Sequence, residues 1–155
     1  MKYYKALLFG SIGSIVETSE IQRKSFNKAF KQYGLDWNWT KRAYSNLLNK
    51  SGGQRRISSY AKKNNKIVNS TYLRNLKTKI FNNYLKKNQL KLRPGVKNLI
   101  LFCKKEKIKL AFVSSTSTNN INAILYSLRN SINKEDFSFV GNSKLVKKFK
   151  PHPAI

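Results

Sequence analysis

The sequence predicts an α/β fold in which a parallel sheet carries a long helical insertion after its first strand. Three observations support this prediction. The apolar run 5–9 is short and ends in a glycine-containing turn, which is typical of a buried strand. A second apolar run, 108–113, ends in a loop rich in serine and threonine. Between the two runs, residues 18–90 show the apolar spacing of helices and no strand pattern.

The insertion is expected to contain four helices. The first covers residues 18–33, with Thr18 as its N-cap. The second opens after a loop containing Trp37 and Trp39, which we interpret as packing residues of the insertion. A short third helix follows a Ser-Gly-Gly break, and a longer fourth helix covers residues 67–85.

After the insertion the pattern alternates between helices and strands. Pro94 stands at the start of a helix whose apolar stripe ends at Cys103. The strand 108–113, a helix over 119–128 and a short strand over 137–140 then follow. Strands separated by helices imply right-handed crossovers and parallel pairing.

This order divides the chain into two parts. Residues 1–17 and 91–155 are expected to form the α/β core, and residues 18–90 an all-helical cap inserted into it. The length of 155 residues is that of about one domain, and the hydrophobic fraction of 40% is ordinary for a globular protein.

Several classes of protein are disfavoured by composition. No apolar run approaches the ~20 residues of a membrane span, and the first residues do not resemble a signal peptide. The single cysteine, Cys103, excludes an intrachain disulfide and fits a reducing compartment, which is the cytoplasm or an organellar matrix or stroma.

Charge is the exceptional feature of the composition. Thirty-two Lys and Arg residues stand against six Asp and Glu residues, which gives a formal net charge of +26. Two interpretations remain open. The surplus can reflect compositional drift, since lysine and asparagine are both abundant, or it can indicate a polyanionic partner such as nucleic acid. The basic residues are scattered along the chain, and no known nucleic-acid-binding motif is present.

Six short segments, in order, carry a resemblance to a known family. They read A-L-L-F-G-S-I-G-S-I-V-E-T, G-L-D-W-N-W, S-G-G-Q-R-R-I, L-R-P-G-V, L-A-F-V-S-S-T-S and K-F-K-P-H-P. The arrangement resembles the haloacid dehalogenase superfamily, and more narrowly its CbbY-type and β-phosphoglucomutase-like phosphatases. The resemblance implies a Rossmann-like core, C-terminally truncated here, and an inserted helical cap.

The resemblance also assigns roles to single positions. Such phosphatases begin with a strand that ends in D-x-D-G-T, where the first Asp is the nucleophile and the second the general acid and base. Gly10 and Ile12 stand at these positions, whereas Gly13 keeps the turn. Ser114 matches the hydroxyl that binds the phosphoryl group, and Lys150 matches the lysine that neutralises its charge.

The rest of the family pattern is incomplete as well. Active relatives hold Mg²⁺ with a later pair of acids that this sequence does not reach, so no cofactor is expected. In the cap, Arg56 matches a substrate-reading loop, but Arg55 replaces an acid, Gln54 replaces a lysine, and Gln22 stands where histidine is frequent. We interpret Glu17, which lies near the first loop, as a helix-start residue and not as a substitute nucleophile.

These observations predict a catalytically inactive phosphatase-fold protein, used as a binding or structural component of a larger, anionic assembly. Anion binding is expected at Gly13, Arg56, Ser114 and Lys150. The alternative is a sugar-phosphate phosphatase that is active only with a complementing chain. A protein partner or self-association is expected to cover the edge of the first strand, because an apolar strand edge left unpaired promotes aggregation.

Overall fold

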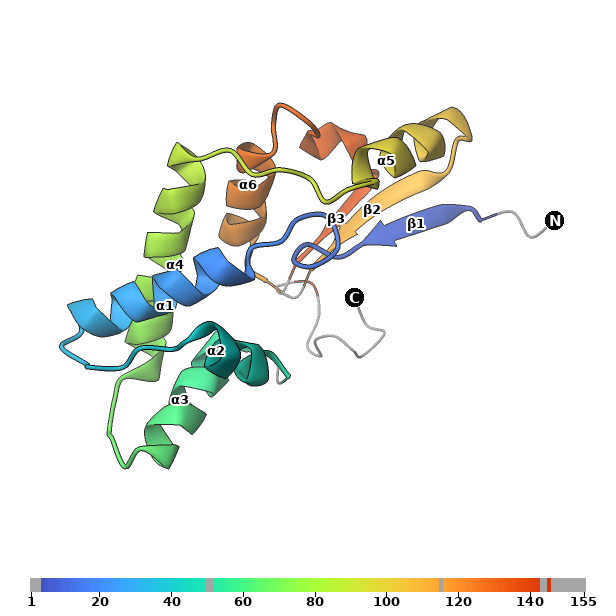
Figure 1. The fold of residues 1–155 in the computed structure, drawn as a ribbon. Helices are drawn as coiled ribbons and strands as arrows, with labels where there is room; N and C mark the ends of the chain where they lie inside the picture. The colour runs from blue at the N-terminus through green and yellow to red at the C-terminus, as the bar shows by residue number, and fades with distance from the viewer. Residues whose placement is uncertain (1–3, 50–51, 115, 143–144, 146–155) are drawn as a thin grey trace. The chain divides into compact units, whose positions relative to one another are not determined.

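The structure is a computed structural model that describes residues 4–49, 52–114, 116–142 and 145. The chain divides into two compact units, shown in Figure 1. One unit contains Met1–Thr18 and Tyr84–Ile155, and the other contains Ser19–Asn83. The second unit ends at Asn83, and the boundary that the sequence suggests for the insertion, at residue 90, stays a prediction.

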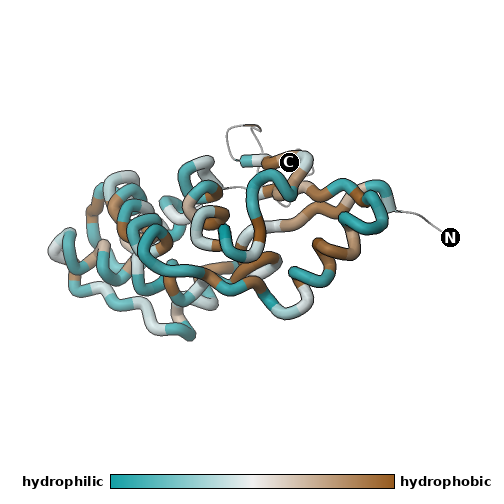
Figure 2. The backbone as a smooth tube through the Cα atoms, turned by 90° about the horizontal axis from the view of Figure 1, so that it is seen from above, coloured by the Kyte–Doolittle hydropathy of each residue, from teal (hydrophilic) through white to brown (hydrophobic). Residues whose placement is uncertain are grey.

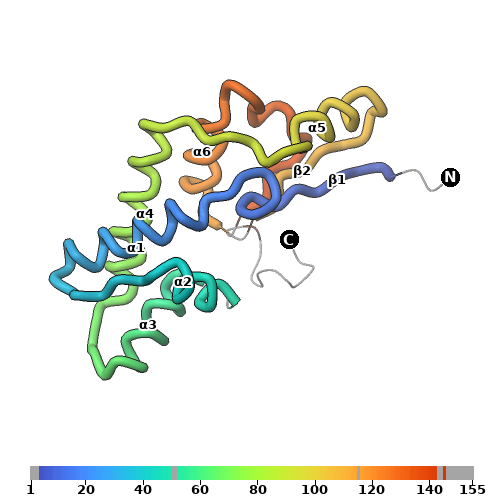
Figure 3. The backbone as a smooth tube through the Cα atoms, viewed as in Figure 1, coloured from blue at the N-terminus to red at the C-terminus, as the bar shows by residue number. Residues whose placement is uncertain are grey.

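A parallel three-stranded sheet forms the centre of the first unit, which confirms the predicted fold class. Its strands are β1 (Ala6–Phe9), β2 (Lys109–Val113) and β3 (Phe139–Gly141), in the order β1-β2-β3. The register pairs Leu8 with Ala111 and Ala111 with Phe139. The tube in Figure 3 allows the chain to be followed from β1 through the insertion and back to β2.

Helix α5 (Val96–Lys105) precedes β2 and helix α6 (Thr118–Ser127) follows it, with the short 3-10 helix η1 (Lys134–Asp136) just before β3. Because consecutive strands are neighbours and parallel crossovers are right-handed, both helices lie on the same face of the sheet. In the view of Figure 1, α5 lies above the strands and α6 lies to their left. The covered face contains a ring cluster, in which Phe137 packs edge-on against Phe9 and Phe112.

The opposite face of the sheet corrects one expectation. The sequence predicts that strand 5–9 is buried, but in β1 only Phe9 is buried and Leu8 is 62% exposed. The reason is topological, since α5 and α6 both protect the other face. The apolar composition therefore predicted the strand correctly, but the prediction that both of its sides are buried was wrong.

The insertion contains four helices, as predicted, and no strand among its described residues. They are α1 (Ser19–Gln32), α2 (Lys41–Leu48), α3 (Gly53–Lys63) and α4 (Ser70–Lys87), of which α4 continues into the first unit. Their shared core is aromatic, and Trp39 lies at its centre, within 4.7–6.0 Å of four neighbouring rings. The cluster is completed by Phe26, Phe30, Trp37, Tyr44, Ile57, Ala61 and Leu73. Both tryptophans are therefore packing residues, as the sequence analysis expects.

Three helix starts differ from the prediction. Thr18 does not cap α1, because its buried hydroxyl has no hydrogen-bond partner within the described part of the chain. Helix α4 begins at Ser70 and not at residue 67, since Asn69 accepts a hydrogen bond from the backbone N–H of Tyr72 and so caps the first turn. Pro94 lies before α5, whose N-cap is Gly95 in a left-handed conformation.

Hydropathy along the backbone follows this architecture. In Figure 2 the apolar stretches run through the strands and along single sides of the helices. Among the residues that the structure describes, no helix is both long and apolar enough to cross a membrane.

A buried ring on β2 and an exposed ring on α5 give a prediction about stability. Replacing the fully buried ring in Phe112→Ala removes one of the two rings that pack against Phe137 and should lower the free energy of unfolding by about 3–5 kcal/mol. The matched control is Phe102→Ala on α5, where the ring is 55% exposed and the expected loss is below about 1 kcal/mol. Urea denaturation of both variants measures the difference, and equal losses would contradict the described packing.

Candidate functional site

The first candidate site begins where β1 ends. The loop after Phe9 folds back on itself, since Gly13 N–H donates to the carbonyl of Val16 (2.8 Å) and the carbonyl of Ser11 accepts from Ile15 (3.2 Å). Gly13 has a φ of +77°, a conformation that side chains disfavour, so the glycine is required by the turn. The predicted turn role of Gly13 therefore has a local structural cause.

A second loop reaches the first at the end of β2. Ser114 directly follows β2, and its N–H donates to the carbonyl of Gly141 at the end of β3 (3.1 Å). The hydroxyl oxygens of Ser114 and Ser11 are 2.9 Å apart and hydrogen-bonded, and each residue is only 7% exposed. The Ser114 hydroxyl also accepts from the N–H of Thr116 (3.3 Å). The structure thus places two buried hydroxyls at the carboxyl edge of the sheet, which is where parallel sheets hold ligands.

Ser11 was not identified by the sequence analysis. It stands between Gly10 and Ile12, the two positions at which the resemblance implies aspartate, and a serine at position 11 is not part of that pattern. Only the pairing of β1 with β2 shows that its hydroxyl meets that of Ser114.

The two positions beside Ser11 lack reactive groups. Gly10 has no side chain, and Ile12 is 42% exposed and forms a bridge with Val16. Neither residue can attack phosphorus or transfer a proton. Among the described residues no group of three or more His, Cys, Asp or Glu side chains lies close enough to hold a metal. This donor set does not fit Mg²⁺, which prefers carboxylate oxygens.

The carboxylates nearest in sequence are engaged elsewhere. Glu17 lies 3.6 Å from the guanidinium of Arg93. Glu20 forms a two-pronged pair with Arg23, at 2.7 and 2.9 Å, and this hydrogen bonding lowers the pKa of Glu20. Both groups are therefore charged partners of arginines, and Glu17 lies two residues before the start of α1.

The hydroxyl-rich loop after β2 also has a structural task. Ser117 is the N-cap of α6 and accepts from the N–H of Asn120. The amide nitrogen of Asn120 donates to the hydroxyl of Thr116 (2.8 Å), while its buried carbonyl oxygen has no hydrogen-bond partner among the described residues. The serine and threonine run thus combines a helix cap with Ser114, whose hydroxyl faces the first loop.

The second candidate site lies within the insertion, around the start of α3. Gly52 has a φ of +99°, and a side chain at Gly53 would contact Phe26. Arg56 donates from Nε to the carbonyl of Leu47 (2.8 Å), and its guanidinium lies over the ring of Tyr44. Burial lowers the pKa of Arg56. The predicted anion-binding residue is thus held by the fold of the insertion itself.

Lys77 is a buried cation that the sequence analysis missed. It lies on α4, donates a hydrogen bond to Gln22, and sits 5.0 and 4.8 Å from the ring centres of Phe26 and Phe81. Burial lowers the pKa of Lys77 to about 7, and the positive charges of Arg56 and Arg74 act in the same direction. A signal was present, because Lys77 falls four residues from Phe81 within an apolar helical stripe.

Other reactive groups carry no site. Burial raises the pKa of the Cys103 thiol, which keeps it protonated and unreactive. Lys150, the predicted phosphate ligand, lies outside the described residues.

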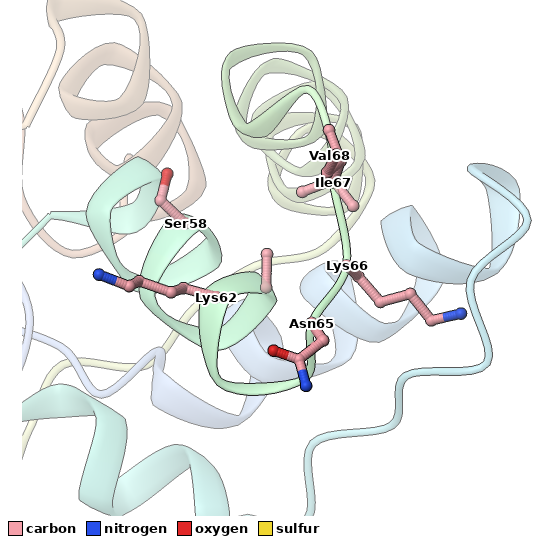
Figure 4. Close-up of a pocket in the computed structure, with 7 residues that line it drawn as sticks. Ser58, Lys62, Asn65, Lys66, Ile67 and Val68 are labelled. Atoms are coloured by element: carbon pink, nitrogen blue, oxygen red, sulfur yellow. The ribbon is translucent and has the colours of Figure 1, made fainter.

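A pocket beside the turn between α3 and α4 is shown in Figure 4, and it contains neither a carboxylate nor a thiol. Its lining residues are Ser58, Ala61, Lys62, Asn65, Lys66, Ile67 and Val68.

Comparison with known sequences points to one family. Residues 13–155 match the family described as haloacid dehalogenase-like hydrolase. The chain is 30% identical over 154 residues to the protein CbbY of Cereibacter sphaeroides, covering 97% of this chain and 67% of that protein. It is 30% identical over 162 residues to a CBBY-like protein of Arabidopsis thaliana, covering 97% of this chain and 50% of that protein.

Solved structures agree with the sequence matches. The fold resembles two structures of CbbY from Rhodobacter sphaeroides, each with a TM-score of 0.85 and 29% identity, covering 97% of this chain and 68% of that one. One is an Asp-to-Asn variant in complex with xylulose-(1,5)bisphosphate, and the other is in complex with phosphate.

The burial of Lys77 leads to a prediction about pH. Its pKa is lowered from the ordinary value of 10.5 to about 7, so above pH 7 the unfolded chain binds a proton that the folded chain has lost. The free energy of unfolding should therefore rise with pH above 7, by up to about 1.4 kcal/mol per pH unit from this group.

Denaturation of Lys77→Met between pH 6 and 9 measures this contribution. The variant should lose the rise that Lys77 causes, whereas Lys79→Met, at an exposed position of the same helix, should keep it. Identical slopes for the wild type and Lys77→Met would contradict the burial of an uncompensated amine.

Proposed function

The chain belongs to the haloacid dehalogenase-like hydrolases and is of the CbbY type, and on that premise we propose that it binds a sugar phosphate. The proposed site lies at the carboxyl edge of the sheet, in the loops that follow β1 and β2. The observation that carries the proposal is the pair of buried hydroxyls of Ser11 and Ser114, 2.9 Å apart.

A hydroxyl pair of this kind suits a phosphate. Each hydroxyl can rotate and donate to a phosphoryl oxygen, and hydrogen bonds to a charged acceptor are stronger than those between neutral groups. The glycine turn next to Ser11 exposes backbone to an approaching ligand without a side chain at Gly10 or Gly13.

The relatives suggest the class of ligand. Two solved CbbY structures that share the fold at 29% identity hold xylulose-(1,5)bisphosphate and phosphate. These relatives support a phosphorylated sugar as the ligand of this chain.

The electrostatics favour anion binding without a metal. A carboxylate that approaches a phosphate repels it, and active phosphatases of this family offset that repulsion with Mg²⁺. In this chain positions 10 and 12 are occupied by Gly10 and Ile12, so no carboxylate at these positions repels the phosphate. The net charge of +26 raises the local concentration of anions further.

Hydrolysis by this chain alone is not expected on these grounds. Covalent catalysis and metal charge stabilisation each lower the barrier to phosphoryl transfer by several kcal/mol, and each 1.36 kcal/mol is tenfold in rate. Without a nucleophile at position 10 or a proton carrier at position 12, the chain binds and releases its ligand unchanged.

Phosphatase activity is the second candidate, and the comparisons favour it. The match to hydrolases extends over residues 13–155, and 97% of the chain aligns with CbbY proteins. In this second candidate function, a complementing polypeptide supplies the missing carboxylates.

A third proposal, which the surplus of cations supports, is a role within an anionic assembly that contains nucleic acid.

Calorimetry tests the proposed site. Inorganic phosphate and xylulose-1,5-bisphosphate should bind without Mg²⁺, and Ser114→Ala should weaken binding about tenfold to a hundredfold by removing a hydrogen bond to a charged group. The control is Ser138→Ala, because Ser138 lies exposed at the other end of the sheet and should leave affinity unchanged. No heat of binding, or equal losses in both variants, would refute the site.

Restoring the family carboxylates tests the electrostatic argument. In the double variant Gly10→Asp/Ile12→Asp, phosphate affinity without metal should fall at least about tenfold, because two carboxylates would face the anion. The double variant Leu99→Asp/Leu101→Asp, with the same added charge on the exposed side of α5, serves as the control.

An assay of ester hydrolysis with a complementing polypeptide separates the two candidate functions. The wild-type chain, mixed with a polypeptide comprising the part of CbbY from Cereibacter sphaeroides that this chain does not cover, should release no phosphate from xylulose-1,5-bisphosphate, with or without Mg²⁺. Metal-dependent release by that mixture, or by the purified chain alone, would establish the phosphatase and reject the binding protein.

A further inference from the structure

The turn between α3 and α4 carries a pocket that the proposed function leaves unused. The pocket has a volume of about 540 Å³, which lies within the usual range of ligand pockets. Two stretches of the insertion line it, the end of α3 and the return segment 65–68, as Figure 4 shows. We refer to it as the turn pocket.

Backbone hydrogen bonds hold the walls of the turn pocket in place. Asn65 has a φ of +51°, and its N–H donates back to the carbonyl of Lys62 (3.2 Å). The N–H of Lys66 donates to the carbonyl of Ala61 (3.0 Å). This pair of bonds is the Schellman arrangement, which closes the end of a helix. The return segment therefore leaves α3 in a direction that the backbone fixes.

The floor of the turn pocket is aliphatic. Ala61 belongs to the aromatic core cluster of the insertion, and Val68 packs against the same cluster. Ile67, between the turn and Val68, is fully exposed. A single exposed isoleucine is ordinary on a protein surface, but this one borders an aliphatic pocket. The floor and Ile67 together offer a site for an aliphatic side chain of a partner.

The rim of the turn pocket is cationic. Lys62 and Lys66 extend from the turn in opposite directions, as Figure 4 shows. Neither lysine forms an ion pair with a carboxylate of the described residues. Between residues 53 and 83 the sequence has eight Lys and Arg residues and no Asp or Glu. The eight cations are Arg55, Arg56, Lys62, Lys63, Lys66, Arg74, Lys77 and Lys79.

Shape and charge together define the ligand of the turn pocket. We propose that it docks an acidic peptide segment, in which one aliphatic side chain lies on the floor of the pocket against Ile67, while acidic residues on either side face Lys62 and Lys66. Charge complementarity speeds the encounter and sets the register of the peptide. Burial of the aliphatic side chain adds affinity, because apolar surface leaves water.

Other anions suit the turn pocket less well. Single-stranded nucleic acid is held by aromatic rings on which its bases stack, and none of the described residues that line this pocket has a ring. A small inorganic anion makes no use of an aliphatic floor. A second copy of this chain would bring a further +26 to the contact.

Fluorescence anisotropy with two labelled peptides tests the proposal on the whole 155-residue chain. The first peptide is Glu-Asp-Glu-Asp-Leu-Glu-Asp-Glu-Asp, and the second has serine in place of leucine at the same charge. The leucine peptide should bind at least about tenfold more tightly, because it alone places an aliphatic side chain in the pocket. Since the assay contains no phosphate, its result is independent of the site at the edge of the sheet.

A pair of exposed aliphatic residues locates the contact. Ile67→Ser should reduce the preference for the leucine peptide to below about threefold, because the side chain that borders the pocket is lost. Leu48→Ser removes another exposed aliphatic residue of the insertion and should leave the preference unchanged. Both positions are exposed, so both variants should fold, which circular dichroism verifies.

Reversed charges test the rim. The double variant Lys62→Glu/Lys66→Glu should weaken binding of the leucine peptide at least about tenfold more than Lys28→Glu/Lys31→Glu, which makes the same change of net charge at exposed positions of α1.

Three outcomes would overturn the proposal. Absent binding, or equal affinities for the two peptides, would show that the pocket takes no aliphatic side chain. Equal effects of Ile67→Ser and Leu48→Ser would place the contact elsewhere. Displacement of the leucine peptide by oligothymidylate at a lower concentration than by unlabelled peptide would make nucleic acid the ligand of this surface.

Discussion

The parallel pairing of β1 with β2 is the constraint on which both the candidate site and the burial of the sheet depend. It joins two short strands separated by the whole helical insertion, and it brings Ser11 and Ser114, 103 residues apart in sequence, into hydrogen-bond contact. Phe9 and Phe112 are register partners in the same pairing and pack around Phe137 on the covered side. If the register slipped by one residue, the buried and exposed sides of β1 would exchange.

The pairing of β1 with β2 fixes where the two loops lie, and this position does not depend on whether the loops carry reactive side chains. Parallel strands direct their carboxyl ends to one edge, so loops with small residues and hydroxyls gather there whatever side chains they carry. Ser11, Gly13 and Ser114 form that geometry here, whereas Gly10 and Ile12 carry no side chain that can attack phosphorus or transfer a proton. On the proposed function, the fold binds phosphate without a nucleophile at the end of β1, because affinity and bond cleavage depend on different atoms.

The sequence predicted the parallel α/β core and the helical insertion because both produce strong apolar periodicity. It misjudged the burial of Leu8, since burial depends on which side the crossovers run and not on the residue itself. It missed Ser11 and Lys77 for a related reason. A serine in a glycine-rich loop and a lysine on a helix are both ordinary, and only their partners, Ser114 and Gln22, make them exceptional.

The most direct measurement is an NMR titration of the isotopically labelled chain with inorganic phosphate, in buffer without divalent metal. The account predicts saturable shifts concentrated at the backbone amides of Gly10–Gly13 and of Ser114 and Thr116, where the loops after β1 and β2 meet. Shifts confined to scattered lysines, or no saturation at all, would contradict it, because phosphate would then be bound by surface charge and not by the hydroxyl pair.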